Sequence, residues 1–282
     1  MPLVPSSTPL THFRLLSFDV YGTLVDWETG IATALLASPH LSSLPSSHPF
    51  KTSRKALLKA FETHERAIQT AHPNMLYSAV LGESYKQLVA SLSTSTSNDT
   101  TKETENDDAL VAAAAAFSGS IASWPAFPDT LAALHALSAR STLVPLTNTS
   151  NALFAQTRAR ALAGAPLAAA CTAEDVGSYK PALANFEYLF ARAQADFGVP
   201  RDRILHVAQS LWHDHVPAAR LGLESVWVDR GGVMGGEEGE EGEEVAGARY
   251  AWRVRSLGEL AERIEEAVRE EGGKGEGVGE GV

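Results

Sequence analysis

Four short apolar runs in this chain alternate with segments of helical character. The runs cover residues 15–18, 143–146, 204–207 and 225–228, and the helical segments cover 130–139, 152–162, 182–194 and 216–221. Such alternation is typical of a parallel sheet that is covered by helices on both faces. We therefore expect an α/β core, and ligands of open α/β sheets bind at the carboxyl edge of the strands.

Residues 27–124 break this rhythm. They contain helical segments at 52–71 and 77–92 and an alanine-rich stretch at 109–117, and they show no convincing strand pattern. We predict an all-helical cap at 27–124, inserted into a core formed by 1–26 and 125–282. Two polar stretches, about 91–108 and about 231–247, and the tail after 271 are expected to be disordered, because they cannot bury enough apolar surface to offset ordering.

The composition narrows the possible partners. The 282 residues carry a formal net charge of −11, which argues against nucleic acid and anionic membranes as partners, although much of the charge lies in one Gly-Glu run. The single cysteine, Cys171, excludes an intramolecular disulfide and a cysteine-based metal cluster. No secretory signal or membrane-length apolar stretch is evident, so a cytoplasmic protein is expected, with a homodimer as a possible assembly.

The first apolar run ends in a carboxylate. Asp19 follows residues 15–18 directly, and Tyr21, Gly22 and Thr23 come next. A strand that ends at a turn points its last side chain into the crevice at the sheet edge. Asp19 is therefore a candidate nucleophile, although a plain turn-capping role is the alternative.

The second apolar run ends in hydroxyl and amide side chains. Thr147 and Asn148 are expected to face the site, because such groups hold a carboxylate without adding competing charge. Thr149 or Ser150 is the expected N-cap of the next helix.

Two further strand ends supply charged candidates. Lys180 precedes Pro181, and proline favours the first helical position, so Lys180 is expected at the mouth of a helix. After 204–207 come Ser210 and Asp214. His213 and His215 flank Asp214 as expected exposed or capping side chains, and two histidines alone are a weak metal signal.

These motifs, in this order over residues 13–229, resemble those of the haloacid dehalogenase superfamily, in particular its 2-haloacid dehalogenase branch. The resemblance rests on Asp19-Val20-Tyr21-Gly22-Thr23-Leu24, Thr147-Asn148, Lys180-Pro181 and the stretch from Gln209 to Asp214. It implies a Rossmann-like parallel sheet with an inserted helical cap. It also implies three catalytic residues: Asp19 attacks the substrate, Lys180 neutralises charge, and Asp214 orients Lys180 or activates water.

The resemblance further implies substrate-binding residues, namely Tyr21, Thr23, Thr147, Asn148, Ser210 and a cap arginine. Arg66 is the nearest candidate for that arginine, but another pairing of the sequences places Glu62 there. A tyrosine of the family is Phe186 in this chain.

Two departures bear on the chemistry. Phosphatases of the superfamily carry a second Asp where Tyr21 stands, and a phenol is a poor acid at neutral pH. Magnesium phosphatases carry an acid where Gln209 stands, and losing a carboxylate weakens a magnesium site. A halide needs neither group to leave.

The leading hypothesis is hydrolytic removal of halide from a small 2-haloalkanoic acid through an aspartyl ester on Asp19, without a cofactor. The alternatives are a magnesium-dependent phosphatase and a catalytically weak protein whose cap binds a protein or metabolite.

Overall fold

The core of the protein is a six-stranded parallel sheet. The computed structural model describes residues 3–72, 74–92, 103–232 and 245–276. The strand order is β3-β2-β1-β4-β5-β6. The strands are β1 (Leu15–Phe18), β2 (Thr142–Thr147), β3 (Cys171–Thr172), β4 (Ile204–Ala208), β5 (Ser225–Val228) and β6 (Trp252–Val254). The expected parallel α/β core is confirmed, and β3 and β6 are additions to the strands expected from the sequence.

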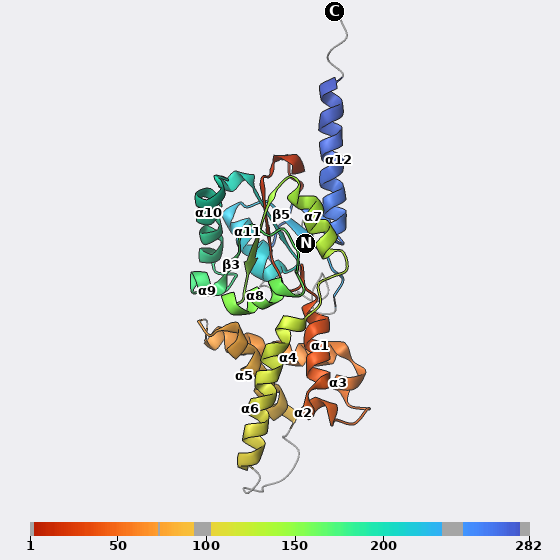
Figure 1. The fold of residues 1–282 in the computed structure, drawn as a ribbon, viewed down its shortest axis with the longest axis vertical. Coiled ribbons are helices and arrows are strands. Elements are labelled where there is room, and N and C mark those ends of the chain that lie inside the picture. The colour runs from red at the N-terminus through yellow and green to blue at the C-terminus, as the bar shows by residue number, and fades with distance from the viewer. Residues whose placement is uncertain (1–2, 73, 93–102, 233–244, 277–282) are drawn as a thin grey trace, which may run out of the picture.

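Helices cover both faces of the sheet (Figure 1). They are α7 (Thr130–Ser138), α8 (Asn151–Ala159), α9 (Ala173–Val176), α10 (Leu183–Phe197), α11 (Val216–Leu221) and α12 (Leu257–Glu276), with short turns η1 (Leu10–His12) and η3 (Arg201–Arg203). Leu15 of β1 packs in the same apolar cluster as Phe186 of α10, and Leu16 packs in the cluster of Leu134 of α7 and Leu260 of α12. Successive side chains of β1 therefore enter the apolar layers on opposite faces of the sheet, which explains why all four residues of the strand are buried.

Every described element between Trp27 and Ser123 is helical, and these helices lie together beyond one edge of the sheet (Figure 1). They are α1 (Trp27–Ala37), α2 (Pro39–Ser42), α3 (Pro49–Thr52), α4 (Arg54–Ala71), α5 (Tyr77–Leu92), α6 (Glu103–Gly119) and η2 (Ser120–Ser123). Phe61, Tyr85 and Phe117 form an aromatic centre among α4, α5 and α6, with ring centroids 5.4 Å apart in both contacts to Phe117. We keep the division into a core (1–26 and 125–282) and a cap (27–124) as a proposal.

Three expectations about local structure need correction. Helix α5 continues to Leu92 and α6 begins at Glu103, so the polar stretch 91–108 is helical at both ends; 93–102 lie outside the described residues, as do 233–244 of the stretch 231–247. Helix α12 continues to Glu276, past the expected start of the tail, and 277–282 lie outside the described residues. Acidic residues ahead of an alanine run suit a helix start, which explains the early start of α6.

The third correction concerns Pro181. It is not the first residue of a helix, because α10 begins at Leu183 and Pro181 lies in the preceding turn. The residue before a proline is disfavoured in helical conformation, which is consistent with Lys180 lying outside the helix.

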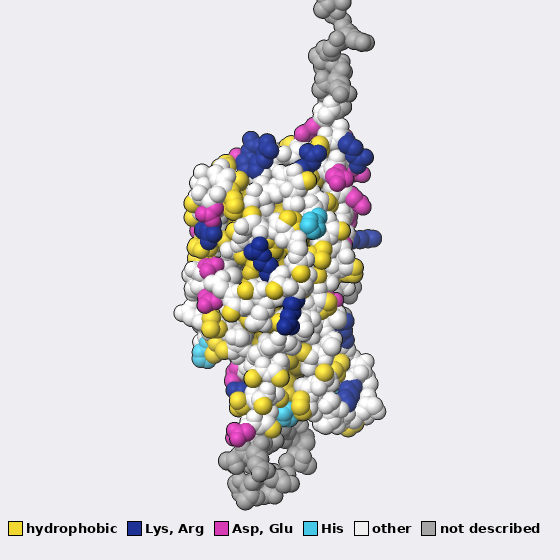
Figure 2. Space-filling model, in the orientation of Figure 1, with side chains coloured by type: hydrophobic (Ala, Val, Ile, Leu, Met, Phe, Trp, Pro, Cys, Tyr) yellow, Lys and Arg dark blue, Asp and Glu magenta, His cyan; other side chains and the backbone are white. Residues whose placement is uncertain are grey.

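Charge on the molecular surface is dispersed on the face that Figure 2 shows, where Lys and Arg side chains lie singly rather than in one basic patch. Among the described helices, none combines the length and the apolar character needed to cross a membrane.

The contact between α1 and the end of the cap gives a stability prediction. A Cβ at Gly30 would lie 2.2 Å from Cγ of Trp124, whose side chain is buried. Gly30→Ala should therefore lower the free energy of unfolding by about 1–3 kcal/mol, the usual cost of overpacking a core. Thermal and urea unfolding would measure this.

Gly119→Ala is the matched control, because Gly119 has helical dihedral angles and a Cβ there would meet nothing within 4 Å. It should leave stability unchanged or slightly raised. Equal stability of the Gly30→Ala and wild-type proteins would contradict the close packing of α1 against Trp124.

Candidate active site

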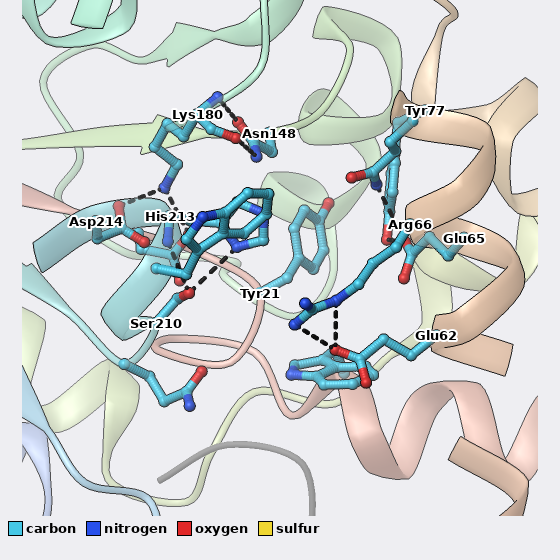
Figure 3. A pocket seen from close by; sticks show the side chains of 15 residues that line it. Tyr21, Glu62, Glu65, Arg66, Tyr77, Asn148, Lys180, Ser210, His213 and Asp214 are labelled. Carbon is cyan, nitrogen blue, oxygen red and sulfur yellow. Dashed lines mark hydrogen bonds and ion pairs between the residues drawn. The ribbon is translucent and has the colours of Figure 1, made fainter. Parts of the chain in front are cut away.

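The carboxyl ends of β1, β2 and β4 meet at a cavity of ≈ 130 Å³ between the sheet and the cap helices (Figure 3). The core side of the cavity includes Asp19, Tyr21, Asn148, Lys180, Gln209, Ser210, Trp212, His213 and Asp214. Trp27, Glu62, Glu65, Arg66, Gln69 and Tyr77 line the rest. The sheet brings together strand ends that are up to about 190 residues apart in the sequence, as expected for parallel strands in neighbouring positions.

The carboxylate of Asp19 is held at both oxygens. Oδ1 accepts a hydrogen bond from Nζ of Lys180 at 2.9 Å, and Oδ2 accepts one from Oγ1 of Thr23 at 2.7 Å. Oγ1 of Thr23 in turn accepts from the backbone N–H of Gln209 at 2.9 Å. Gly22 makes the intervening turn with a φ of 103°, a conformation that side chains disfavour. The Gly-Thr turn thus fixes the orientation of Asp19, and Thr23 acts on Asp19 rather than lining the cavity.

The ammonium of Lys180 is buried and uses all three of its donors. Nζ lies 2.9 Å from Oδ1 of Asp19, 2.7 Å from Oδ1 of Asp214 and 2.9 Å from the carbonyl oxygen of Leu146. Burial acts to lower the pKa of Lys180, but the two carboxylates outweigh it and raise the pKa above its ordinary value. Lys180 is therefore a fixed positive charge between two acids.

Asn148 positions Lys180. Its Nδ2 donates to the carbonyl oxygen of Lys180 at 3.0 Å, and its Oδ1 accepts from the backbone N–H of Lys180 at 2.7 Å. The amide of Asn148 lies at the cavity, as expected, and its contacts with the protein hold the lysine loop in place.

Asp214 has two oxygens in different environments. Oδ1 accepts from Lys180 and from Nε2 of His206, at 2.7 and 2.8 Å, while Oδ2 is buried and has no hydrogen-bond partner among the described residues. Burial acts to raise the pKa of Asp214, but Lys180 and His206 lower it below its ordinary value. Asp214 is therefore an ionised carboxylate in which Oδ1 is hydrogen-bonded and Oδ2 has no hydrogen-bond partner among the described residues.

Asp19 differs from Asp214 in its balance of forces. Burial and the charge of Asp214 raise the pKa of Asp19, while Lys180 and Thr23 lower it, and the net direction is upward. Nζ of Lys180 lies closer to Asp214 than to Asp19, at 2.7 against 2.9 Å, and Asp214 also accepts a hydrogen bond from His206.

The phenol of Tyr21 cannot supply protons to the site. Its ring lines the cavity, but its hydroxyl lies 2.8 Å from Oγ1 of Thr157 on α8. Burial raises the pKa of Tyr21 to about 12.

Thr147 was expected to face the site and does not line the cavity. Strand β2 continues through Thr147, which pairs with Thr172 in the sheet, and the side chain of Thr147 is buried. The strand ends one residue later than the sequence indicated, so Thr147 remains part of the sheet. Ser150 caps α8, its side chain accepting from the N–H of Leu153, as one of the two expected N-caps.

The cap side of the cavity contains an ion pair. Nε and Nη2 of Arg66 lie 3.1 and 3.0 Å from Oε1 of Glu62, and the guanidinium stacks over Trp212 at 5.5 Å from the ring centroid. Arg66 and Glu62, the two alternatives for one role, are therefore both at the cavity, as partners. In Figure 3 dashed lines join the Arg66 guanidinium to the Glu62 carboxylate.

A second cap carboxyl lies beside this pair. Oε1 of Glu65 accepts a hydrogen bond from the hydroxyl of Tyr77 at 2.7 Å. Burial raises the pKa of Glu65 to about 7, with a smaller contribution from Glu62 in the same direction.

The two histidines beside Asp214 are not exposed caps, contrary to expectation. His213 lines the cavity, and burial lowers its pKa to about 4. His215 is completely buried, with Nδ1 2.9 Å from Oγ of Ser225 and Nε2 3.0 Å from the carbonyl oxygen of Ala208. Both histidines belong to the π-helical turn η4 (Leu211–His215), which follows β4 and precedes α11.

The donor set does not suit magnesium. Lys180 lies between Asp19 and Asp214, Tyr21 and Gln209 replace carboxylates, and no group of three acidic, histidine or cysteine side chains in the described part of the chain could hold a metal. Magnesium prefers several anionic or carbonyl oxygens in an octahedral array, which these residues do not offer.

The chain belongs to the haloacid dehalogenase-like hydrolases, because the model of that hydrolase family matches residues 13–222. No curated protein matches the sequence.

Solved structures with the same fold include several dehalogenases. The L-2-haloacid dehalogenase PA0810 is 23% identical and has a TM-score of 0.66, with 90% of this chain and 99% of that chain covered. The L-2-haloacid dehalogenase from Xanthobacter autotrophicus with chloropropionic acid covalently bound is 14% identical, with a TM-score of 0.66 and coverage of 90% and 98%. The putative HAD-hydrolase YfnB from Bacillus subtilis, bound to magnesium, is 17% identical, with a TM-score of 0.67 and coverage of 89% and 98%.

Several site residues were not singled out from the sequence. His206 contacts Asp214, but it lies within an apolar strand pattern that indicated only burial. Trp212 and Trp27 line the cavity. Trp212 stands between Ser210 and Asp214 in the fourth motif, and its place there is the only signal that could have found it.

The raised pKa of Glu65 gives a pH prediction. The folded protein binds the Glu65 proton more tightly than the unfolded chain does, since the pKa rises from 4.5 to about 7. The stabilising effect of that proton is complete below pH 4.5 and is lost as the pH rises through about 7. The Gln side chain of Glu65→Gln cannot ionise, so the variant does not lose this stability. Its free energy of unfolding should therefore rise relative to that of the wild type as the pH increases over this window. Urea titrations at several pH values would measure the difference.

Glu83→Gln is the matched control, because it removes a cap carboxylate on α5 that does not line the cavity. A constant difference between Glu65→Gln and the wild type from pH 4.5 to above 7 would show that Glu65 does not titrate in this range.

Proposed function

We propose that the protein is a metal-independent hydrolase that removes halide from a small 2-haloalkanoic acid through an ester on Asp19. The observation that carries the proposal is the arrangement of Asp19, Lys180 and Asp214 at the cavity, with Nζ of Lys180 at 2.9 and 2.7 Å from the two carboxylates. Family membership supports the hydrolase, and the nature of the leaving group rests on the residues of the site.

In the first step an oxygen of Asp19 attacks C2 of the substrate. A carbon–oxygen bond forms, the carbon–halogen bond breaks, and the halide leaves with the bonding electrons. A halide departs without a proton. The site matches this requirement, because the Tyr21 hydroxyl is turned to Thr157 and cannot act as an acid.

In the second step water attacks the carbonyl carbon of the Asp19 ester. Oδ2 of Asp214, which has no hydrogen-bond partner in the described structure, takes a proton from the water. The ester C–O bond breaks, and the leaving alkoxide takes the proton back from Asp214 to give a 2-hydroxy acid. The Asp19 carboxyl then loses the second proton of the water to solvent, which regenerates the Asp19 carboxylate. Lys180 stabilises the negative charge that develops on the ester oxygen.

The substrate carboxylate is assigned to Arg66, the cation that the cap contributes to the cavity. A guanidinium binds carboxylates through two parallel hydrogen bonds, and an incoming carboxylate would exchange with Glu62 for this contact. The stack on Trp212 keeps the guanidinium plane oriented for that exchange.

The nucleophile is tested by Asp19→Asn. The amide cannot form the ester, so halide release from 2-chloropropionate should fall by at least about a thousandfold, as for other nucleophile deletions. An ion-selective electrode or colorimetric halide assay would measure this.

Asp229→Asn is the control, because Asp229 also follows a buried strand but pairs with Arg253 outside the cavity. It should retain activity. Halide release by Asp19→Asn at the wild-type rate would refute the covalent route.

Metal independence gives a second test. Halide release should be the same with and without EDTA, because Lys180 already provides the positive charge between the carboxylates. Hydrolysis of p-nitrophenyl phosphate that depends on added magnesium, together with no halide release, would instead identify a phosphatase.

A further inference from the structure

A chain of buried polar side chains extends from Asp214 into the sheet. Nε2 of His206 lies 2.8 Å from Oδ1 of Asp214, and Nδ1 of His206 lies 2.6 Å from Oγ of Ser17. Ser17 belongs to β1 and His206 to β4, where they are neighbours across the parallel ladder. All three side chains are completely buried.

The chemistry of the partners sets the direction of these hydrogen bonds. An ionised carboxylate only accepts, so Nε2 of His206 must carry a hydrogen and donate it to Oδ1 of Asp214. Ser17 can serve Nδ1 in either sense, because a hydroxyl both donates and accepts.

The imidazole ring is also fixed by packing. Phe186 of α10 meets it edge to face, with ring centroids 5.2 Å apart and an interplanar angle of 75°. Leu205 and Val207 on either side of His206 are buried apolar residues. Burying the polar side chains of Ser17 and His206 among apolar residues costs stability unless both are hydrogen-bonded. Packing alone therefore does not explain why these two residues are present.

The explanation lies in the two oxygens of Asp214. Lys180 and His206 both bind Oδ1, and this fixes the rotation of the carboxylate. Oδ2 is left without a protein partner among the described residues, at a side chain that lines the cavity. Without His206, Lys180 alone would hold the carboxylate, which could then rotate about its bond and present either oxygen.

We propose that His206, supported by Ser17, is a positioning residue that holds Oδ1 of Asp214 so that Oδ2 faces the hydrolytic water. The inference rests on the proposed function and adds a residue that acts only in the second step. Formation of the Asp19 ester does not use Asp214 as a base, so the loss of His206 should slow hydrolysis of the ester much more than its formation.

The kinetic test compares His206→Leu with His206→Gln and with His215→Leu. Leucine removes the donor, and glutamine retains an N–H near the position of Nε2. His215 is the matched control, because it is an equally buried histidine with two hydrogen bonds, to Ser225 and Ala208, and none of them reaches Asp214. Each folded variant is mixed with 2-chloropropionate, and the ester on Asp19 is followed by intact-protein mass spectrometry alongside halide release.

His206→Leu should form the ester at close to the wild-type rate and hydrolyse it about ten- to a hundredfold more slowly, the range for losing a hydrogen bond to a charged group. The ester should therefore accumulate. His206→Gln should recover most of the hydrolysis rate, and His215→Leu should show no accumulation. Hydrolysis by His206→Leu at the wild-type rate, or equal ester accumulation in His206→Leu and His215→Leu, would overturn the inference.

A spectroscopic measurement separates this inference from the proposed function. In ¹⁵N-histidine NMR of the wild-type protein, Nε2 of His206 should carry a hydrogen whose resonance shifts in Asp214→Asn. An unprotonated Nε2 would overturn the inference even in a protein that releases halide. Absence of halide release and of an Asp19 ester from the wild type would overturn the proposed function, and the NMR result would still decide the contact of His206 with Asp214.

Discussion

The buried ammonium of Lys180 is the interaction on which the rest of the site depends. A charge removed from water is costly unless it is paired and hydrogen-bonded, and Nζ meets this requirement with Asp19, Asp214 and the carbonyl oxygen of Leu146. These partners follow or belong to three neighbouring strands, so the ammonium ties together the carboxyl ends of β1, β2 and β4. The positive charge of Lys180 also allows the Asp19 and Asp214 carboxylates to lie close together, because it offsets the repulsion between their negative charges.

The two acids are positioned by different parts of the core. Thr23 of the Gly22-Thr23 turn hydrogen-bonds Asp19, while His206 of β4 hydrogen-bonds Asp214. The cap contributes a different chemistry, an Arg66–Glu62 ion pair and a Glu65–Tyr77 hydrogen bond, on the opposite side of the cavity (Figure 3). In the proposed reaction the core residues make and break the bonds, and the cap residues face the remainder of the substrate. Substrate choice is therefore expected to lie in the cap, and reaction type in the strand ends.

Strand ends were predictable from the sequence because an apolar run followed by a polar residue marks the carboxyl edge of a parallel sheet. Asp19 follows such a run directly, whereas Lys180 and Asp214 were identified by their place in the order of the motifs. The three side chains meet in the structure. Thr147 was misplaced because a strand end cannot be assigned to within one residue, and one residue reverses the direction of a side chain. His206 was missed because pairing across strands depends on register, which periodicity does not reveal. Strand β3, with two residues, is too short to leave a pattern.

The source of the oxygen in the product tests the central claim most directly. A single turnover of excess enzyme with 2-chloropropionate in H₂¹⁸O distinguishes attack by Asp19 from attack by water. If Asp19 forms the ester, the new hydroxyl oxygen of the product comes from its carboxylate and is unlabelled, and the ¹⁸O appears in Asp19. A product hydroxyl labelled with ¹⁸O in that first turnover, with unlabelled Asp19, would contradict the account.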